Sequence, residues 1–555
     1  MNSNTQMFSH FTKVHLIYRA ILALMFILAS LGYANSQSVN EEIYKIPIED
    51  SKGEDYRIIS LGEKGVLVVL NSADYSKGKS ALHISYLDST LTERWSHVQE
   101  ISSETIVMDY DIDGNDVYVL LKVKGREYEI LKVDVVSRQI DKKPYDNLEE
   151  IEITHFKTAQ GKCFLGGTTD KNPLAICYDF QSGNSQILQS INQLKVTLVT
   201  LDVFAEEETV VLVLKGPNTG KFKGLYINAY DFSGRLRYNY FELPNPNYNL
   251  ITFRPYFGSN GRLIMLGTYS LRNDNLAQGV YSMVLNKGVE EAFRFYDFGY
   301  FKHFYNYLPE KKREDMVVRI QDKRDKDKIH LLRHRLFVHD LEVTDNQVVF
   351  VAEEASFIYP RQSNILLRGG GEGTDWVGDG YQSMKYFVQD HDNLLINKGE
   401  HVPSGLVNAK VEEGKTFPIQ FRYKHAFACG FDKDGQLKWD NSFSMNHTNM
   451  DLPIEMVQVY ADTDEVYFIK PDRDNIHYKV SGRMEYDEQN LVMPMKDNRP
   501  EQRIVYFDHG GVQPWFNKNF LFSGIRYSEH ALNDGGEEKV FFIKKLSFLD
   551  EKLSE

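Results

Sequence analysis

The sequence predicts an all-β chain folded as a β-propeller of eight four-stranded blades, or alternatively of seven. Strongly apolar strands follow tight turns at intervals of mostly about 50 residues, which is the length of one four-stranded blade. Short strands that end in Asp or Asn also recur, and an aromatic residue usually follows each at a fixed distance. No helical periodicity alternates with these strands, so a parallel α/β sheet is not expected.

Eight apolar strands are interpreted as the inner strands of the blades. They begin at Val66, Val117, Cys163, Val210, Leu263, Val348, Val466 and Phe520. The intervals after Leu263 and after Val348 are much longer than the rest. They predict two insertions in the ring, at about residues 297–335 and 360–424.

The Asp-terminated strands are interpreted as the first halves of hairpins. The best copies end at Asp88, Asp231, Asp432 and Asp508, and the aromatic residues that follow them are Trp95, Tyr238, Trp439 and Trp515. Asn286 precedes Phe293 in the same way, whereas Asp134 and Asp179 lack the aromatic residue. An Asp side chain accepts hydrogen bonds from turn amides. The four Asp residues are therefore expected at equivalent turns of different blades.

The last blade lacks an outer strand in this scheme. Its recognisable strands are Phe520–Ile525 and Val540–Leu546, after which the apolar pattern stops. The segment Ile43–Ile48 can supply the missing strand by pairing with Val540–Leu546. Such closure removes the exposed strand edges that an open sheet leaves.

The hydrophobic-Asp-x-x-Gly-x-x-x-Trp pattern of these hairpins resembles the repeats of quinoprotein-like (PQQ-like repeat) β-propellers. It is also similar to that of uncharacterised exported propeller proteins of Bacteroidota-type bacteria. Among quinoprotein-like propellers, some members bind a quinone cofactor and others are scaffolds for outer-membrane assembly. The cofactor-binding members typically use adjacent cysteines, and this chain has no Cys-Cys pair. The resemblance therefore implies a propeller without a quinone.

Residues 1–36 have the pattern of a secretory signal peptide. Lys13 and Arg19 precede the apolar run 20–31, and Ala34-Asn35-Ser36 fits a cleavage site that leaves Gln37 as the mature N-terminus. A membrane anchor is the alternative, but the run is shorter than the roughly 20 residues that cross a bilayer. We expect an exported protein, periplasmic or extracellular, that does not span a membrane after cleavage, with residues 37–555 forming a single propeller domain.

The chain carries 64 basic and 78 acidic residues, a net charge of −14. This balance disfavours nucleic acid as a partner, because affinity for phosphate comes from Lys and Arg. A protein or a glycan is the expected ligand.

Cys163, Cys177 and Cys429 are too few for a disulfide framework. A hairpin centred on Asp170 would place Cys163 directly opposite Cys177. Either a disulfide between them or two buried thiols agrees with that arrangement, and Cys429 is expected to be a free thiol.

The motif Asp109-Tyr-Asp111-Ile-Asp113-Gly is the one candidate metal site. Carboxylates on alternate residues followed by Gly can wrap a calcium ion. The position that would supply the last EF-hand ligand is Leu120, so an EF-hand is excluded. The alternative is a plain hairpin turn, and no cofactor other than calcium is expected.

His330 and His334 have the spacing of two ligands on one helical face, but Leu331 stands where a metalloprotease needs Glu. A zinc protease is therefore excluded, and an incidental pair is favoured. Residues 310–335 hold ten basic and six acidic residues. They are expected to form a helical stretch, either a solvated cap or a docking element for an acidic partner.

The second insertion contains the glycine-rich segment 368–376, which ends at Trp376. A loop that covers a ligand is one interpretation of it. The function expected overall is that of a non-catalytic binding or scaffold propeller of the cell envelope. The alternative is a hydrolase or lyase that acts on a polysaccharide, and the sequence identifies no catalytic residue. Two carboxylates with an Arg or His at the channel mouth would favour the enzyme.

Overall fold

The computed structural model describes the chain between residues 43 and 548. The described ranges are 43–48, 53–74, 79–146, 150–169, 172–188, 196–216, 224–272, 275–344, 346–358, 420–450, 455–462, 465–472, 475–482, 489–494, 502–530 and 537–548. The expected signal peptide lies outside them, as do residues 359–419 with Trp376.

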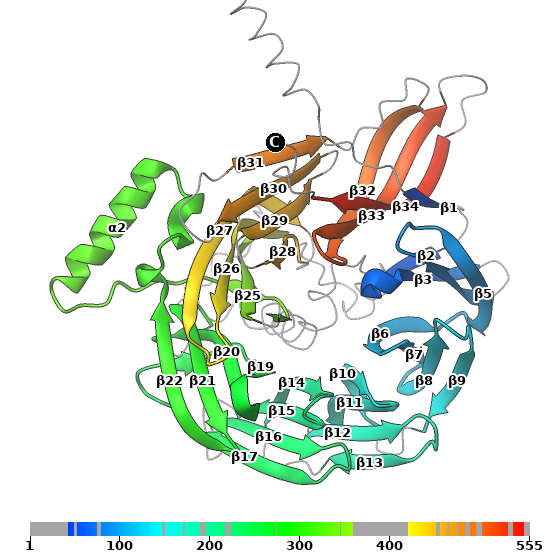
Figure 1. Ribbon diagram of the computed structural model, residues 1–555, viewed down its shortest axis with the longest axis horizontal. Helices are drawn as coiled ribbons and strands as arrows, with labels where there is room; N and C mark the ends of the chain where they lie inside the picture. Colours follow the sequence, from blue (N-terminus) through cyan, green and yellow to red (C-terminus); the bar gives the residue numbers. More distant parts are fainter. Residues whose placement is uncertain are drawn as a thin grey trace, which may run out of the picture.

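Eight antiparallel sheets form a closed ring, a β-propeller, as the sequence predicts (Figure 1). Blades 1 to 4 follow the chain directly. Blade 1 is β2 (Gly53–Ser60), β3 (Val66–Asp74), β4 (Lys79–Leu87) and β5 (Glu93–Ser102). Blade 2 is β6 (Ile106–Asp113), β7 (Asp116–Lys124), β8 (Glu127–Asp134) and β9 (Ile140–Tyr145). Blade 3 is β10 (Glu152–Ala159), β11 (Lys162–Thr169), β12 (Asn172–Asp179) and β13 (Ser185–Leu188). Blade 4 is β14 (Thr197–Phe204), β15 (Thr209–Lys215), β16 (Leu225–Asp231) and β17 (Leu236–Glu242).

Blades 5 and 6 have a divided innermost strand. Blade 5 is β18 (Asn249–Leu250) and β19 (Arg254–Phe257), then β20 (Leu263–Ser270), β21 (Gly279–Asn286) and β22 (Val289–Asp297). Blade 6 is β23 (Leu336–Val338) and β24 (Glu342–Val343), then β25 (Val348–Ile358), β26 (Gln420–Phe431) and β27 (Leu437–Met450). Blade 7 is β28 (Gln458–Ala461), β29 (Glu465–Asp472), β30 (Asn475–Gly482) and β31 (Gln489–Pro494). Blade 8 is β32 (Gln502–Pro514), β33 (Asn519–His530), β34 (Glu537–Ser547) and β1 (Ile43–Pro47).

The helical elements of the described ranges are few. They are α2 (Glu310–Arg324) and the 3-10 turns η1 (Gly62–Lys64), η2 (Ser259–Gly261), η3 (Phe298–Tyr300) and η4 (Phe304–Tyr307). Among the described residues, no helix is both long and apolar enough to cross a membrane.

The eight apolar strands of the sequence are the second strands of the blades, not the innermost ones. β3, β7, β11, β15, β20, β25, β29 and β33 each lie between the innermost strand and the third strand. Their side chains are buried on both faces of the sheet, as the core of β15 from Thr209 to Leu214 shows. A strand buried on both faces reads as a continuous apolar run, which explains why it dominates the pattern.

The predicted closure of the ring is confirmed. β1 pairs antiparallel with β34, from Ile43 opposite Lys544 to Pro47 opposite Val540, and is the outermost strand of blade 8. Beneath this pairing, Tyr44 and Ile46 pack against a core cluster that contains Ile543 and residues of blade 1. The first and last strands of the ring therefore share one sheet and one core.

The Asp turns are confirmed for three of the four predicted residues. Asp88, Asp231 and Asp432 each follow or end the third strand of a blade, and one carboxylate oxygen of each accepts backbone N–H groups of the turn that follows. Asp134 and Asp179, which lack the aromatic residue, also accept backbone N–H groups of the turns that follow them in blades 2 and 3. These turns are one residue longer, because the Asp134 N–H donates to the carbonyl of Gln139, whereas the Asp231 N–H donates to that of Arg235.

The prediction for Asp508 is wrong. This residue lies inside β32, the innermost strand of blade 8, where the ladder shifts register between Asp508 and Gly511. A bulge within a strand uses the same Asp and Gly residues as a hairpin turn, so the two patterns look alike in sequence.

The predicted opposition of Cys163 and Cys177 is also wrong. In the β11–β12 hairpin, Cys163 is opposite Tyr178 and Cys177 is opposite Phe164. Thr169 is opposite Asn172, so the register differs by one position from that of a hairpin centred on Asp170. This slip of one position sends the two side chains to opposite faces of the sheet. Cys163 packs between blades 2 and 3, Cys177 packs between blades 3 and 4, and both are free thiols.

The first insertion follows β22 and carries α2, which lies at the outer edge of the ring (Figure 1). The helix ends at Arg324, before the predicted end at Arg335. Asp327 adopts a left-handed backbone (φ 51°), and the Lys328 N–H donates to the Lys323 carbonyl at 2.8 Å. This is the usual chemistry of a helix stop. The second insertion connects β25 to β26, and its predicted last residues, 420–424, belong to β26.

Candidate functional site

Asp109, Asp111 and Asp113 lie on β6, the innermost strand of blade 2. Asp111 Oδ2 accepts the Thr158 N–H at 2.5 Å and Asp113 Oδ2 accepts the Gly161 N–H at 2.7 Å, so both carboxylates join blade 2 to blade 3. Within the described residues, no three His, Cys, Asp or Glu side chains are grouped so as to hold a metal ion. Calcium binding by these three residues stays a prediction that only a binding measurement can test.

Charged side chains from five consecutive blades interact electrostatically across the ring axis. They are Asp109 on β6, Lys157 on β10, Asp202 on β14, Arg254 on β19 and Asp340 between β23 and β24. Lys157 in blade 3 interacts electrostatically with Asp340, which lies three blades further round the ring. Because only the axis brings these blades together, we call these five residues the ring-axis cluster.

The cluster shifts the protonation of its own members. Burial alone would lower the pKa of Lys157, but Asp111, Asp340, Asp109 and Asp202 raise it well above its usual range. Burial raises the pKa of Asp202, against the opposing effect of a hydrogen bond from Thr200 Oγ1 and the charges of Lys157 and Arg254. Lys157 is therefore held as a cation, whereas Asp202 is the carboxyl group that most easily keeps its proton.

Arg254 fixes the irregular strand of blade 6 against blade 5. Its guanidinium donates to the carbonyl oxygens of His339 at 3.1 Å and Val338 at 2.8 Å, and it lies 3.5 Å from Asp340 Oδ1. These contacts position Asp340 at the axis. Arg254 is consequently a structural member of the cluster as well as a charged one.

His155 lies beside the cluster but has no free ring nitrogen. Its Nδ1 is 2.8 Å from Thr154 Oγ1, and its Nε2 is 3.2 Å from the Val199 carbonyl oxygen. Burial lowers its pKa to about 4. A histidine that is neutral and hydrogen-bonded at both nitrogens cannot accept a proton from a substrate without losing one of these bonds.

Blade 6 adds two buried groups of acids and histidines next to the axis. Glu353 Oε1 accepts from His339 Nε2 at 3.0 Å, and His339 Nδ1 faces Glu455 Oε1 at 3.8 Å. Burial opposes the charge on His339, but Glu455 and Glu353 outweigh it and raise its pKa to about 9. Burial likewise raises the pKa of Glu455 to about 8.

The second group fastens the first insertion to blade 6. Glu354 Oε2 lies 2.9 Å from His334 Nδ1 and 3.2 Å from His425 Nδ1, and Glu354 Oε1 accepts from Lys424 at 2.6 Å. Tyr307 stacks on His425 with ring centroids 3.7 Å apart. His334 thus serves the contact between insertion and blade, and it is not on a helix with His330.

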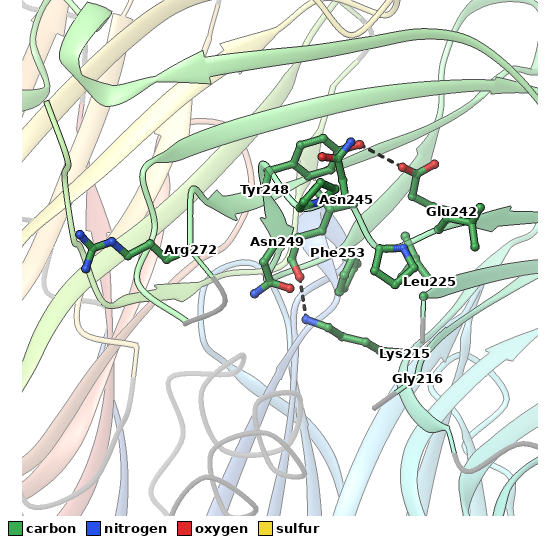
Figure 2. A pocket seen from close by; sticks show the side chains of 14 residues that line it. Lys215, Gly216, Leu225, Glu242, Asn245, Tyr248, Asn249, Phe253 and Arg272 are labelled. Carbon is green, nitrogen blue, oxygen red and sulfur yellow. Dashed lines mark hydrogen bonds between the residues drawn. The ribbon is translucent and has the colours of Figure 1, made fainter. Parts of the chain in front are cut away.

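A pocket opens between blades 4 and 5, where the chain crosses from β17 to β18 (Figure 2). Its volume is about 360 Å³. The lining combines the end of β15, the crossing segment 242–250 and Arg272. Lys215 Nζ donates to the Leu250 carbonyl at 2.6 Å, and Tyr248 donates to Glu242 Oε1 at 3.0 Å.

Sequence reasoning missed both the ring-axis cluster, except for Asp109, and this pocket. Lys157, Asp202 and Arg254 are each preceded in the chain by ordinary strand residues and carry no motif. The sequence does contain a signal for these three residues, because each lies six to nine positions before the start of an apolar second strand. A charged residue repeated at that place marks a strand that faces the axis.

Comparisons with known proteins identify no family. No family model matches the chain, and no curated protein matches it. Solved structures that resemble it include the β-propeller domain of the Trilobed protease from Pyrococcus furiosus, at 8% identity and a TM-score of 0.33, covering 81% of this chain and 98% of that one. Another is the polysaccharide lyase Uly1, at 9% identity and a TM-score of 0.35, covering 80% of this chain and 90% of that one. A prolyl endopeptidase has 10% identity and a TM-score of 0.37, covering 86% of this chain and 54% of that one. These values are too low for any function to be carried over.

Proposed function

We propose that this protein is a non-catalytic binding propeller whose ligand sits on the ring-axis cluster. The observation that supports the proposal is the meeting of three carboxylates and two cations from five blades in one small region. Such a set offers both donors and acceptors to a polar ligand. A glycan, or a polar loop of a partner protein, has the matching groups.

The state of His155 supports binding over catalysis. This histidine lies beside the cluster, and both its nitrogens are engaged. The repeats resemble those of quinoprotein-like propellers, some of which are scaffolds for outer-membrane assembly, and a role in the cell envelope agrees with that resemblance.

Binding is tested with the purified protein on an array of neutral and charged oligosaccharides, followed by calorimetry on those retained. The variant Asp202→Asn keeps the volume of the side chain and removes its charge. We expect it to weaken binding at least tenfold. Lys323→Met, on the exposed face of α2, is the matched control and leaves affinity unchanged. Equal affinities of the wild type and Asp202→Asn would place the ligand elsewhere.

A second candidate function is hydrolysis or cleavage of a polysaccharide, and Asp202 is the observation that favours it. A half-buried carboxyl group with a raised pKa can act as a general acid. Release of new chain ends from the retained oligosaccharides decides between the two functions. Turnover that Asp202→Asn abolishes supports the enzyme, and retention without turnover supports the binding protein.

We also propose export, on the basis of residues 1–36. The protein recovered from the cell envelope or the medium should begin at Gln37. Edman sequencing of that material tests the point, and an intact Met1 in the same fraction would contradict it.

A further inference from the structure

The pocket between blades 4 and 5 has walls that are formed before any ligand arrives. Its crossing segment reads Leu243-Pro-Asn-Pro-Asn-Tyr248, and two prolines restrict the backbone of such a segment. Asn245 Oδ1 accepts the Asn247 N–H at 2.9 Å, which closes a further turn. A wall that is already ordered lowers the conformational entropy that is lost when a ligand binds.

The tyrosine of this segment is fixed on both sides. The Tyr248 ring packs against Phe295, with centroids 4.7 Å apart, and its hydroxyl donates to Glu242. Glu242 Oε2 lies 2.6 Å from a second hydroxyl, that of Tyr240, whose proton it shares with Glu290 Oε2, also at 2.6 Å. The carboxylate of Glu242 is therefore committed to two tyrosines of the wall.

The floor and the rim of the pocket are apolar. Leu225, Leu250 and Phe253 form a buried floor. Leu243 stands at the rim with 67% of its surface exposed, between the strand β17 and Pro244. Apolar surface at the mouth of a concave site is typical of a place that holds an organic ligand.

Two cations complete the lining. Lys215 lies at the end of β15 with its ammonium 5.7 Å from the centre of the Phe253 ring. Arg272 lies on the opposite side of the pocket from Glu242 (Figure 2). Arg272 is exposed, and its guanidinium makes no ion pair within the described part of the chain. Lys215 and Arg272 outnumber Glu242 in the lining, so the formal charge of the pocket is positive.

We propose that this pocket is a second binding site, separate from the ring-axis cluster, for a small organic anion: a carboxylate carried on an apolar or ring-shaped body. The body packs between Leu243 and the floor, and the carboxylate accepts hydrogen bonds from Arg272. Arginine suits this task because its planar fork matches a carboxylate. A volume of about 360 Å³ lies at the lower end of the range for small-molecule sites. None of the lining residues belongs to the ring-axis cluster, so a substitution can remove binding at one site without changing the residues of the other.

The test uses three probes on the full-length mature protein. Benzoate carries both the apolar ring and the carboxylate, benzamide is its neutral analogue, and inorganic phosphate is an anion without an apolar body. Ligand-observed NMR and calorimetry are expected to show binding of benzoate in the millimolar range or tighter. Benzamide should bind at least fivefold more weakly, and phosphate should not compete with benzoate.

Two variants separate the charge from the apolar contact. Arg272→Ala should lower the affinity for benzoate about tenfold and leave the affinity for benzamide unchanged, whereas Leu243→Ser should lower the affinity for both probes by the same factor. Arg319→Ala, an exposed position on α2, is the matched control and should behave as the wild type. Phosphate that displaces benzoate would contradict the class of ligand, and equal effects of Arg272→Ala and Arg319→Ala would contradict the site. Asp202→Asn leaves benzoate binding intact if the two sites are separate.

Discussion

Phe164, and not Cys163, lies directly opposite Cys177 in the hairpin of blade 3. The two cysteines therefore point to opposite faces of the sheet, and each thiol is buried in a different core cluster. Burial raises the pKa of Cys177 to about 11, so this thiol is also unreactive in the folded state. Titration of the denatured, unreduced protein should find three free thiols. A count of one would mean that a disulfide forms after all.

Removing residues 37–48 should lower the melting temperature sharply. The deletion takes away β1, exposes the edge of β34 and removes the side chains of Tyr44 and Ile46 from the core that they share with Ile543. The loss of this packing alone amounts to about 3 kcal/mol. Lys45→Ala changes an exposed residue of the same strand and serves as the control. A melting curve of the deletion variant that matches the wild type would refute the closure of the ring.

Replacing Asp231 with Ala should cost roughly 1–2 kcal/mol at neutral pH, because one carboxylate accepts hydrogen bonds from two turn amides and from the side chains of Ser233 and Arg235. Burial opposes the charge, but hydrogen bonds from Ser233 and Arg235 lower the pKa of Asp231 to about 2. A carboxylate with a depressed pKa stabilises the fold above its unfolded pKa of about 4, and the contribution disappears as the pH falls towards 2. The wild type should therefore lose stability on acidification more steeply than Asp231→Ala.

Asp231→Asn is the matched variant for this turn. Its amide oxygen can still accept the Ser233 and Arg235 N–H groups, which lie 2.9 Å and 3.0 Å from the carboxylate oxygen. It should lie between the wild type and Asp231→Ala in urea denaturation at neutral pH. A cost for Asn as large as that for Ala would show that charge, and not turn geometry, is the main contribution.

The stabilising contribution of protonated His339 should be lost at alkaline pH. Its pKa is raised to about 9, so its contribution is complete below the unfolded value of about 6.5 and is lost as the pH rises through 9. Glu455, with its pKa raised to about 8, acts in the same direction, because the folded state must release a proton that the unfolded state has already lost. The melting temperature is expected to fall between pH 6 and pH 9.5.

The variant His339→Gln isolates this effect. It should show a shallower dependence of the melting temperature on pH above 7, whereas His83→Gln, at an exposed position on β4, should follow the wild type. If the melting temperatures of the wild type and His339→Gln changed with pH in parallel, protonation of His339 would not contribute to the pH dependence of stability.

The ring, its number of blades and its closure could be predicted because they depend on local patterns. Each second strand is apolar over its whole length, and Asp88 and its equivalents must occupy turns. The errors arose where two local structures share one pattern. Asp508 has the turn residues of a hairpin but belongs to a bulge. The face of the sheet to which Cys177 points depends on the register of its hairpin, which the sequence pattern leaves uncertain by one position.

The functional residues could not be predicted in the same way. Lys157 and Asp340 are distant in the chain, and only the curvature of the ring brings them together. A strand that faces the axis is exposed on part of its surface, so it lacks the apolar pattern that revealed the second strands. Pocket residues such as Lys215 and Arg272 come from different blades, and their pairing depends on how the chain crosses between two sheets.

The pairing of β1 with β34 also constrains how the protein is made. Its contacts join the two ends of the ring, so they have the largest sequence separation in the fold and form last as the chain leaves the ribosome. Seven blades can fold while β1, the outer strand of the eighth, still lacks its partner β34. A chain cut short before β34 is left with two unpaired strand edges, at which it aggregates or is degraded. Full-length synthesis is therefore a condition for a stable product, and truncated by-products should not accumulate in soluble form.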